Sequence, residues 1–119
     1  MGANNFMSKL TELNTETGLT YCGGMEEIYY EILEEYCNAD LLDVLERTFA
    51  EEDWTNYIIH AHALKSTSLT IGAETLSEEA KGLEMAGKES RYDDIRKNHA
   101  AVIEHYKKVL EHIKEAIKE

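Results

Sequence analysis

The chain has 119 residues, of which 43% are hydrophobic, so it is long enough to form one compact domain with a buried core. Its 24 acidic residues outnumber the 12 basic ones, and the net charge of −12 makes nucleic acid and anionic membranes unfavourable partners. Proline is absent, and the N-terminal residues contain no apolar run long enough for a signal peptide or a membrane span. We therefore expect a helical, cytoplasmic protein that neither inserts into membranes nor binds nucleic acid, and we expect it to be a monomer.

Apolar residues recur at helical spacing along most of the chain, and no linker or internal repeat interrupts them. Residues 1–20 predict a leader or a short helix, which Gly23 and Gly24 end. Five longer helices, joined by short turns, are predicted at about residues 25–37, 40–51, 54–71, 73–87 and 92–118. We expect the first of these to pack across one end of the bundle or to extend the helix that follows it. The pattern predicts an all-α fold: one domain, residues 1–119, forming an antiparallel up-down four-helix bundle with an additional N-terminal helical segment.

The predicted ends of two helices depend on residues with well-defined capping roles. Asp53 is a suitable N-cap for the helix at 54–71, and Gly72 can end that helix. Ser90, followed three residues later by Asp93, is a weak capping-box signal for the last helix.

The helix at 54–71 carries a histidine outside its apolar face. On a helical wheel one sector collects the predicted core residues, which are Tyr57, Ala61, Leu64, Ser68 and Ile71. His62 lies about 100° away from Ala61 on that wheel, so we expect its side chain to be at least partly exposed. Lys65 and Ser66 follow at the i+3 and i+4 positions and share its side of the helix.

Three aliphatic residues, Ile58, Ile59 and Leu69, also fall on the side of the helix that carries His62. Aliphatic side chains are unexpected on a solvated face, and they predict a docking surface around the histidine. A neutral imidazole is a competent nucleophile near neutral pH, and Lys65 offers a cation for incoming phosphoryl oxygens. A single histidine at a helix edge is more often an ordinary surface residue, so the grouping alone does not name a reaction.

The stretch HALKSTSLTIGAETL resembles the signature of histidine phosphotransfer (HPt) domains, H-x-L-K-[GS] followed six residues later by Gly-Ala. The matching positions of this chain are His62, Leu64, Lys65, Ser66, Gly72 and Ala73. The flanking sequences also resemble the family, so the resemblance covers residues 18–115.

The resemblance implies a role for each matching residue. His62 would accept the phosphoryl group on Nε2, with Lys65 as the neighbouring cation. Ser66 stands where the family often has glycine but is still small, and Gly72 matches the glycine that ends the helix. Glu84, 22 residues after the histidine, matches the position whose side chain contacts the other imidazole nitrogen, although a solvated helix glutamate is an equally good interpretation.

The function that the resemblance implies is a phosphorelay step in a two-component system. His62 would carry a phosphoryl group between aspartates of response-regulator receiver domains, one of which could belong to a hybrid histidine kinase. No GxGxxG or GxxxxGK[ST] motif is present, so we expect no autonomous kinase activity. We also expect no metal and no cofactor on this chain, and we place the Mg²⁺ on the receiver domain.

Two other functions fit the sequence. The chain could be the phosphotransfer domain of a chemotaxis-type histidine kinase, phosphorylated from ATP by a separate kinase domain. It could also be a non-catalytic helical scaffold that binds partners through its exposed aliphatic residues.

Overall fold

The computed structural model describes residues 6–118, which are helical apart from short connections. The ends of the predicted domain, residues 1–5 and 119, lie outside the described residues. The helices of the described part, in chain order, are α1 (Phe6–Lys9), α2 (Thr15–Tyr21), α3 (Glu26–Asn38), α4 (Leu42–Ala50), α5 (Trp54–Thr70), α6 (Glu74–Lys88) and α7 (Tyr92–Ile117).

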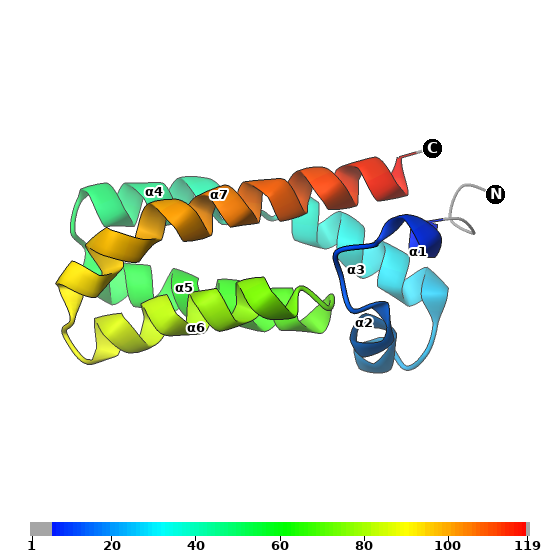
Figure 1. Ribbon diagram of the computed structural model, residues 1–119, viewed down its shortest axis with the longest axis horizontal. Helices are drawn as coiled ribbons and strands as arrows, with labels where there is room; N and C mark the ends of the chain where they lie inside the picture. The colour runs from blue at the N-terminus through cyan, green and yellow to red at the C-terminus, as the bar shows by residue number, and fades with distance from the viewer. Residues whose placement is uncertain (1–5, 119) are drawn as a thin grey trace.

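Helices α4 to α7 run alternately up and down and form an antiparallel four-helix bundle (Figure 1). The fold is therefore all-α, as predicted. The longest helix, α7, runs the length of the molecule, whose dimensions are 47 × 23 × 19 Å. It packs along α5 and α6 for most of its length, and only its C-terminal end extends beyond them (Figure 1).

Helix α3 lies at the end of the molecule where α7 extends beyond the bundle (Figure 1). Two of its tyrosines join it to α5: the Tyr29 hydroxyl donates to the carbonyl of Ile71, and the Tyr36 hydroxyl lies 2.8 Å from that of Ser68. The break between α3 and α4 is held by Leu41, whose N–H donates to the Tyr106 hydroxyl of α7. Of the two placements predicted for this segment, the structure shows packing at one end of the bundle.

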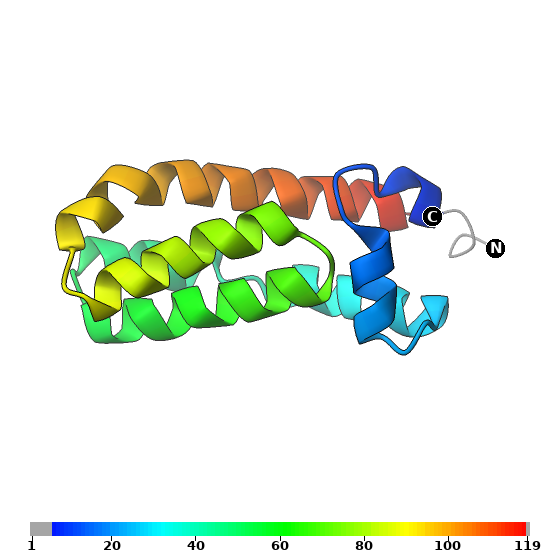
Figure 2. The ribbon, with the colours of Figure 1, turned by 60° about the horizontal axis from the view of Figure 1, so that its bottom comes forward.

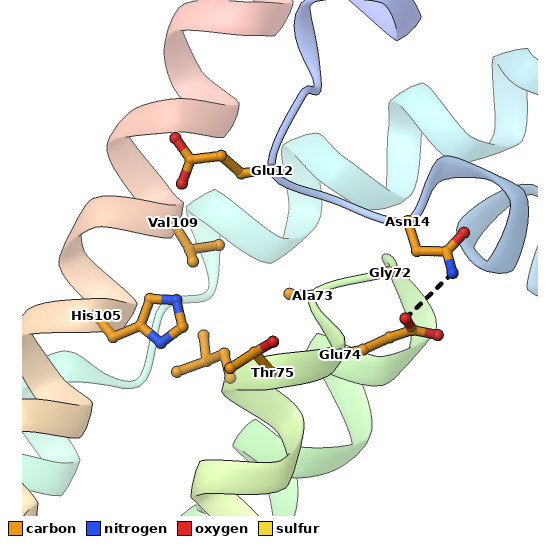
Figure 3. A pocket seen from close by; sticks show the side chains of 9 residues that line it. Glu12, Asn14, Gly72, Ala73, Glu74, Thr75, His105 and Val109 are labelled. Carbon is orange, nitrogen blue, oxygen red and sulfur yellow. Dashed lines mark hydrogen bonds between the residues drawn. The ribbon is translucent and has the colours of Figure 1, made fainter.

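The N-terminal segment is built into the fold by apolar and polar contacts. Phe6 and Leu10 are buried, and α2 crosses the end of the α5–α6 pair (Figure 2). The Asn14 N–H donates to the Gly72 carbonyl, and its side-chain amide donates to Glu74 (Figure 3). The chain therefore enters α2 beside the turn between α5 and α6. The two hydrogen bonds of Asn14 hold that turn against the N-terminal segment.

The two cap predictions have opposite outcomes. Asp53 is the N-cap of α5, where its carboxylate accepts the N–H of Asn56, and Gly72 follows the helix with φ +91°. The capping box predicted at Ser90 is wrong: Ser90 has φ +59° and α7 begins only after Arg91. The guanidinium of Arg91 instead joins the carboxylates of Glu89 and Asp94 across the start of the helix.

Across residues 6–118, each helix is too short or too polar to cross a membrane.

Candidate functional site

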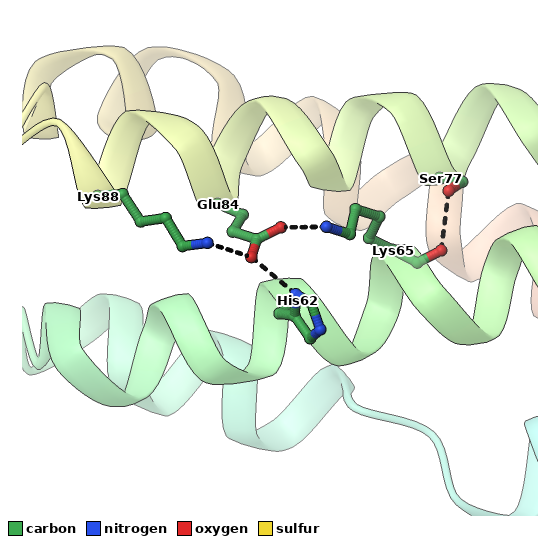
Figure 4. A network of polar contacts seen from close by, with 5 residues as sticks. All are labelled: His62, Lys65, Ser77, Glu84 and Lys88. Carbon is green, nitrogen blue, oxygen red and sulfur yellow. Dashed lines mark hydrogen bonds and ion pairs between the residues drawn. The ribbon is translucent and has the colours of Figure 1, made fainter.

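Helices α5 and α6 pack side by side along their whole length and bring His62 and Glu84 together (Figures 2 and 4). The His62 side chain is 58% exposed, as the helical wheel predicts, whereas that of Glu84 is 2% exposed. Nδ1 of His62 lies 2.7 Å from Oε2 of Glu84. The imidazole therefore lies on the surface with one nitrogen held by a buried carboxylate.

Glu84 is surrounded by three basic side chains. Lys65 Nζ lies 2.8 Å from Oε1, and Lys88 Nζ lies 3.0 Å from Oε2, the oxygen that also contacts His62 (Figure 4). Burial on its own raises the pKa of Glu84, but the contacts with Lys65, Lys88 and His62 outweigh it and lower the pKa to about 2. The buried carboxylate is therefore ionised at neutral pH, and the solvated glutamate considered from the sequence is ruled out.

An ionised carboxylate can only accept a hydrogen bond, so the proton of the Glu84 contact belongs to Nδ1 of His62. In the neutral imidazole this leaves the lone pair on Nε2. Within residues 6–118 Nε2 has no hydrogen-bond partner, and the side chain is largely exposed. Glu84 thus selects the tautomer whose basic nitrogen is open to another molecule.

Two further residues complete the cluster, and the motif did not indicate either of them. Lys88 lies one helical turn after Glu84 on α6, and the i, i+4 spacing of opposite charges was the available sequence signal. The hydroxyl of Ser77 donates to the carbonyl of Lys65 at 2.8 Å, which ties the backbone of α5 to α6 beside the lysine (Figure 4). The side chain of Lys65 is 27% exposed and that of Lys88 is 55% exposed.

The aliphatic residues predicted around His62 divide into two groups. Ile59 and Leu69 are exposed on α5, and Ser66 is also exposed. Ile58 is only half-buried and packs on α6, because a Cβ added to Gly87 would lie 2.5 Å from its Cγ1 atom. Ile58 thus contacts the neighbouring helix while its side chain stays partly exposed, and its part in a docking surface stays a prediction.

Gly72 also lies away from the exposed face. It is buried after the end of α5, about 15 Å from His62 along the helix at 1.5 Å per residue. Its carbonyl accepts the Asn14 N–H. We therefore assign Gly72 a structural role at the turn that ends α5, and we place it outside the group of binding residues in which its match to the motif would include it.

Other polar clusters of the described residues do not resemble a second reaction centre. The pocket beside the α5–α6 turn is lined by Glu12, Glu74 and His105, which come from three separate segments, and the Glu74 carboxylate turns towards Asn14 (Figure 3). No group of three or more His, Cys, Asp or Glu side chains in residues 6–118 is arranged to hold a metal ion.

Residues 31–118 match the family model described as the Hpt domain, which is more than half of the chain. The chain belongs to the Hpt domain family, whose members take part in phosphotransfer in two-component signalling and interact there with receiver domains and kinases. No significant similarity to a curated protein or to a solved structure was found.

The pKa of Glu84 predicts a pH-dependent contribution to stability. Because folding lowers this pKa from 4.5 to about 2, the contribution is complete above pH 4.5 and is lost as the pH falls towards 2. We expect Glu84→Gln to lower the free energy of unfolding by about 1–3 kcal/mol at pH 6, because two lysines lose their charged partner. Urea unfolding at several pH values should show the difference from wild type shrinking below pH 4.5. Glu104→Gln, an exposed position on α7, is the control, and a difference that stayed constant down to pH 2 would contradict the assignment.

Proposed function

We propose that this chain relays a phosphoryl group between aspartates of receiver domains, with His62 as the carrier. The observation that supports the proposal best is the exposed imidazole whose Nδ1 is held by the buried, ionised Glu84. A surface histidine without a function needs no buried carboxylate beneath it, and a scaffold would gain nothing from the fixed tautomer.

In the proposed reaction the Nε2 lone pair of His62 attacks the phosphorus of a phosphoaspartate. A P–N bond forms, the P–O bond to the aspartate breaks, and the aspartate leaves as a carboxylate. The proton on Nδ1 stays in place, so the ring becomes positively charged as the P–N bond forms. Glu84, 2.7 Å from Nδ1, stabilises that charge, and the reverse reaction passes the group to a second aspartate.

The two lysines fit a second requirement of this reaction, which is neutralisation of phosphoryl oxygens on a very acidic protein. Both ammonium groups lie within 3.0 Å of Glu84, the carboxylate that contacts His62, so they concentrate positive charge beside the imidazole. We expect the receiver domain to supply Mg²⁺ and the remaining stabilisation of the transition state.

The test of the proposal is transfer from a panel of phosphorylated receiver domains to this chain. We expect an acid-labile, base-stable label, as phosphohistidine gives, and its loss when a second, unphosphorylated receiver domain is added. Labelling only by an isolated kinase domain with ATP would favour the chemotaxis-type function. If neither the receiver domains nor the kinase domain with ATP labels the chain, the proposal is contradicted, and the non-catalytic scaffold is the function that remains.

The lysines should contribute unequally to the rate of transfer. We expect Lys65→Met to lower the single-turnover rate by roughly 10–100-fold, because this half-buried ammonium is the less screened of the two. Lys88→Met should lower it by less than about 10-fold, since its side chain is 55% exposed. Lys81→Met, at an exposed position of the same helix, is the control and should transfer at the wild-type rate. Equal losses for the three variants would contradict a specific role for the pair beside Glu84.

A further inference from the structure

Ser77 uses its hydroxyl differently from several threonines of the same fold. A serine or threonine inside a helix commonly donates to the carbonyl four residues earlier in that helix. Thr48, Thr67 and Thr70 do so, at distances between 2.7 and 2.9 Å. Ser77 of α6, which is 4% exposed, instead donates to the carbonyl of Lys65 on α5 at 2.8 Å. Its hydroxyl therefore joins two helices, whereas each threonine hydroxyl joins two turns of one helix.

The backbone groups at both ends of this link are satisfied without it. The carbonyl of Lys65 lies inside α5, where the N–H of Leu69, four residues later, is its regular helical partner. The N–H of Ser77 already donates to the carbonyl of Ala73, so the serine is not needed as a cap of α6. The bond between Ser77 and Lys65 is therefore an additional, directional link between α5 and α6.

The link and the ion pair with Glu84 attach Lys65 to α6 at both of its ends. The Lys65 carbonyl accepts the Ser77 hydroxyl, and the Lys65 ammonium lies 2.8 Å from Oε1 of Glu84. Ser77 and Glu84 are seven residues apart on α6 and share one face of that helix with the buried Ala80. Lys65 is thus held against a single face of α6 from its backbone to its ammonium group.

The other residues on this face of α6 are small. Ala80 lies between Ser77 and Glu84, and Gly87 follows Glu84 and packs closely on Ile58 of α5. Apolar contacts are non-directional, and small side chains form shallow ridges, so they restrict sliding of one helix along another less than large side chains do. A hydrogen bond with a preferred distance and angle fixes the position of α5 along α6 more strictly.

We propose that Ser77 is a positioning residue of the phosphotransfer site, which holds Lys65 where its ammonium meets the incoming phosphoryl oxygens. Ser77 lies beyond Lys65 as seen from His62, so it acts through the lysine (Figure 4). The inference rests on the proposed function, because the position of Lys65 affects a rate only if His62 accepts a phosphoryl group. Displacement of a group in an active site by about 1 Å lowers a rate by as much as 100-fold.

The first test is labelling of His62 by phosphoramidate, a small donor that needs no docking. Nε2 of His62 attacks the phosphorus, the new P–N bond forms, and ammonia leaves with its own protons. We expect Ser77→Ala to be labelled about 3–10-fold more slowly than the wild type, a smaller loss than that expected for Lys65→Met. With a phosphorylated receiver domain as donor, the single-turnover rate should fall equally and KM should stay unchanged, because Ser77 is buried.

Thr48→Val is the matched control for the loss of a buried hydroxyl. Thr48 is 2% exposed on α4, and its hydroxyl also donates to a backbone carbonyl, beside the N-cap of α5. Both variants should lower Tm by a similar amount, about 2–8 °C, because each loses one buried hydrogen bond. Only Ser77→Ala should be labelled more slowly. Equal slowing of the two variants would show that Ser77 only supports the fold, and would overturn the inference.

A double-mutant cycle distinguishes an effect through Lys65 from an effect elsewhere. If Ser77 acts by holding Lys65, the double variant Ser77→Ala/Lys65→Met should be labelled at the rate of Lys65→Met, to within about twofold. A further 3–10-fold loss in the double variant would overturn the inference, because Ser77 would then act independently of the lysine.

The outcomes separate this inference from the proposed function. If phosphoramidate labels Ser77→Ala and the wild type at the same rate, Ser77 is not a positioning residue and the relay stands. If phosphoramidate labels His62 but no receiver domain does, the relay is overturned, while the labelling rates of the variants still decide the role of Ser77.

Discussion

Replacing His62 by glutamine should reduce phosphoryl transfer from any receiver domain to background. The glutamine amide is similar in size and can still donate a hydrogen bond to Glu84, but it has no basic nitrogen to attack phosphorus. The fold should persist, because the His62 side chain is 58% exposed and contributes little buried area. We expect a change in the free energy of unfolding of about 1 kcal/mol or less.

The neighbouring histidine provides the control for this experiment. His60 lies two residues earlier on α5 and is half-buried. At about 100° per residue, its side chain points about 160° away from that of His62, so His60→Gln should accept the label at the wild-type rate. Residual acid-labile label on His62→Gln would show that another residue carries the phosphoryl group, and the mechanism proposed above would be wrong.

Gly72→Ala should destabilise the protein by about 2–4 kcal/mol, the largest loss that we expect from a single added methyl group. Gly72 has φ +91°, a conformation that L residues rarely adopt. A Cβ at this position would also collide with the carbonyl oxygen of Asn14. The atoms that it would meet belong to the backbone of Asn14, which is held by the Asn14–Gly72 hydrogen bond that attaches the N-terminal segment to the bundle.

Two other glycines separate the effects of strain and collision. Gly24 has φ +78° but open space around its Cβ position, so Gly24→Ala should cost only about 1 kcal/mol. Gly82 lies within α6 with equally open space, so Gly82→Ala should stabilise the helix by about 0.5–1 kcal/mol. Urea unfolding of the three variants measures the series. A Gly72→Ala variant no less stable than Gly24→Ala would contradict the close contact with Asn14.

The helices were predictable because their signals are local. Apolar periodicity placed the start of α5 at Trp54 and that of α7 at Tyr92, as the structure has them. The cap at Asp53 was also recognisable, since a carboxylate before an apolar run is a local signal. The cap of α7 was predicted wrongly by the same reasoning: the sequence indicated Ser90, but Arg91 precedes the helix and bridges two carboxylates there.

The candidate site was predictable only in part. The motif indicated His62, Lys65 and Glu84, but it left open whether Glu84 is buried or solvated. The structure decides this, because α6 turns Glu84 towards α5 and places two lysines and the imidazole around it. Ile58 shows what a helical wheel leaves out. The wheel placed Ile58 outside the core sector, but it does not say which side of the helix a neighbouring helix covers, and α6 covers part of Ile58.

The sequence by itself determined that this protein is an acidic all-α domain with a histidine, a lysine and a small residue at phosphotransfer spacing on one helix. These properties depend on composition and on residues within one or two turns of each other. The tertiary structure alone decided that Glu84 is buried and ionised and that Ile58 packs on α6. The physical reason is that burial and pKa depend on how closely two helices approach, and that distance is set by the side chains of both.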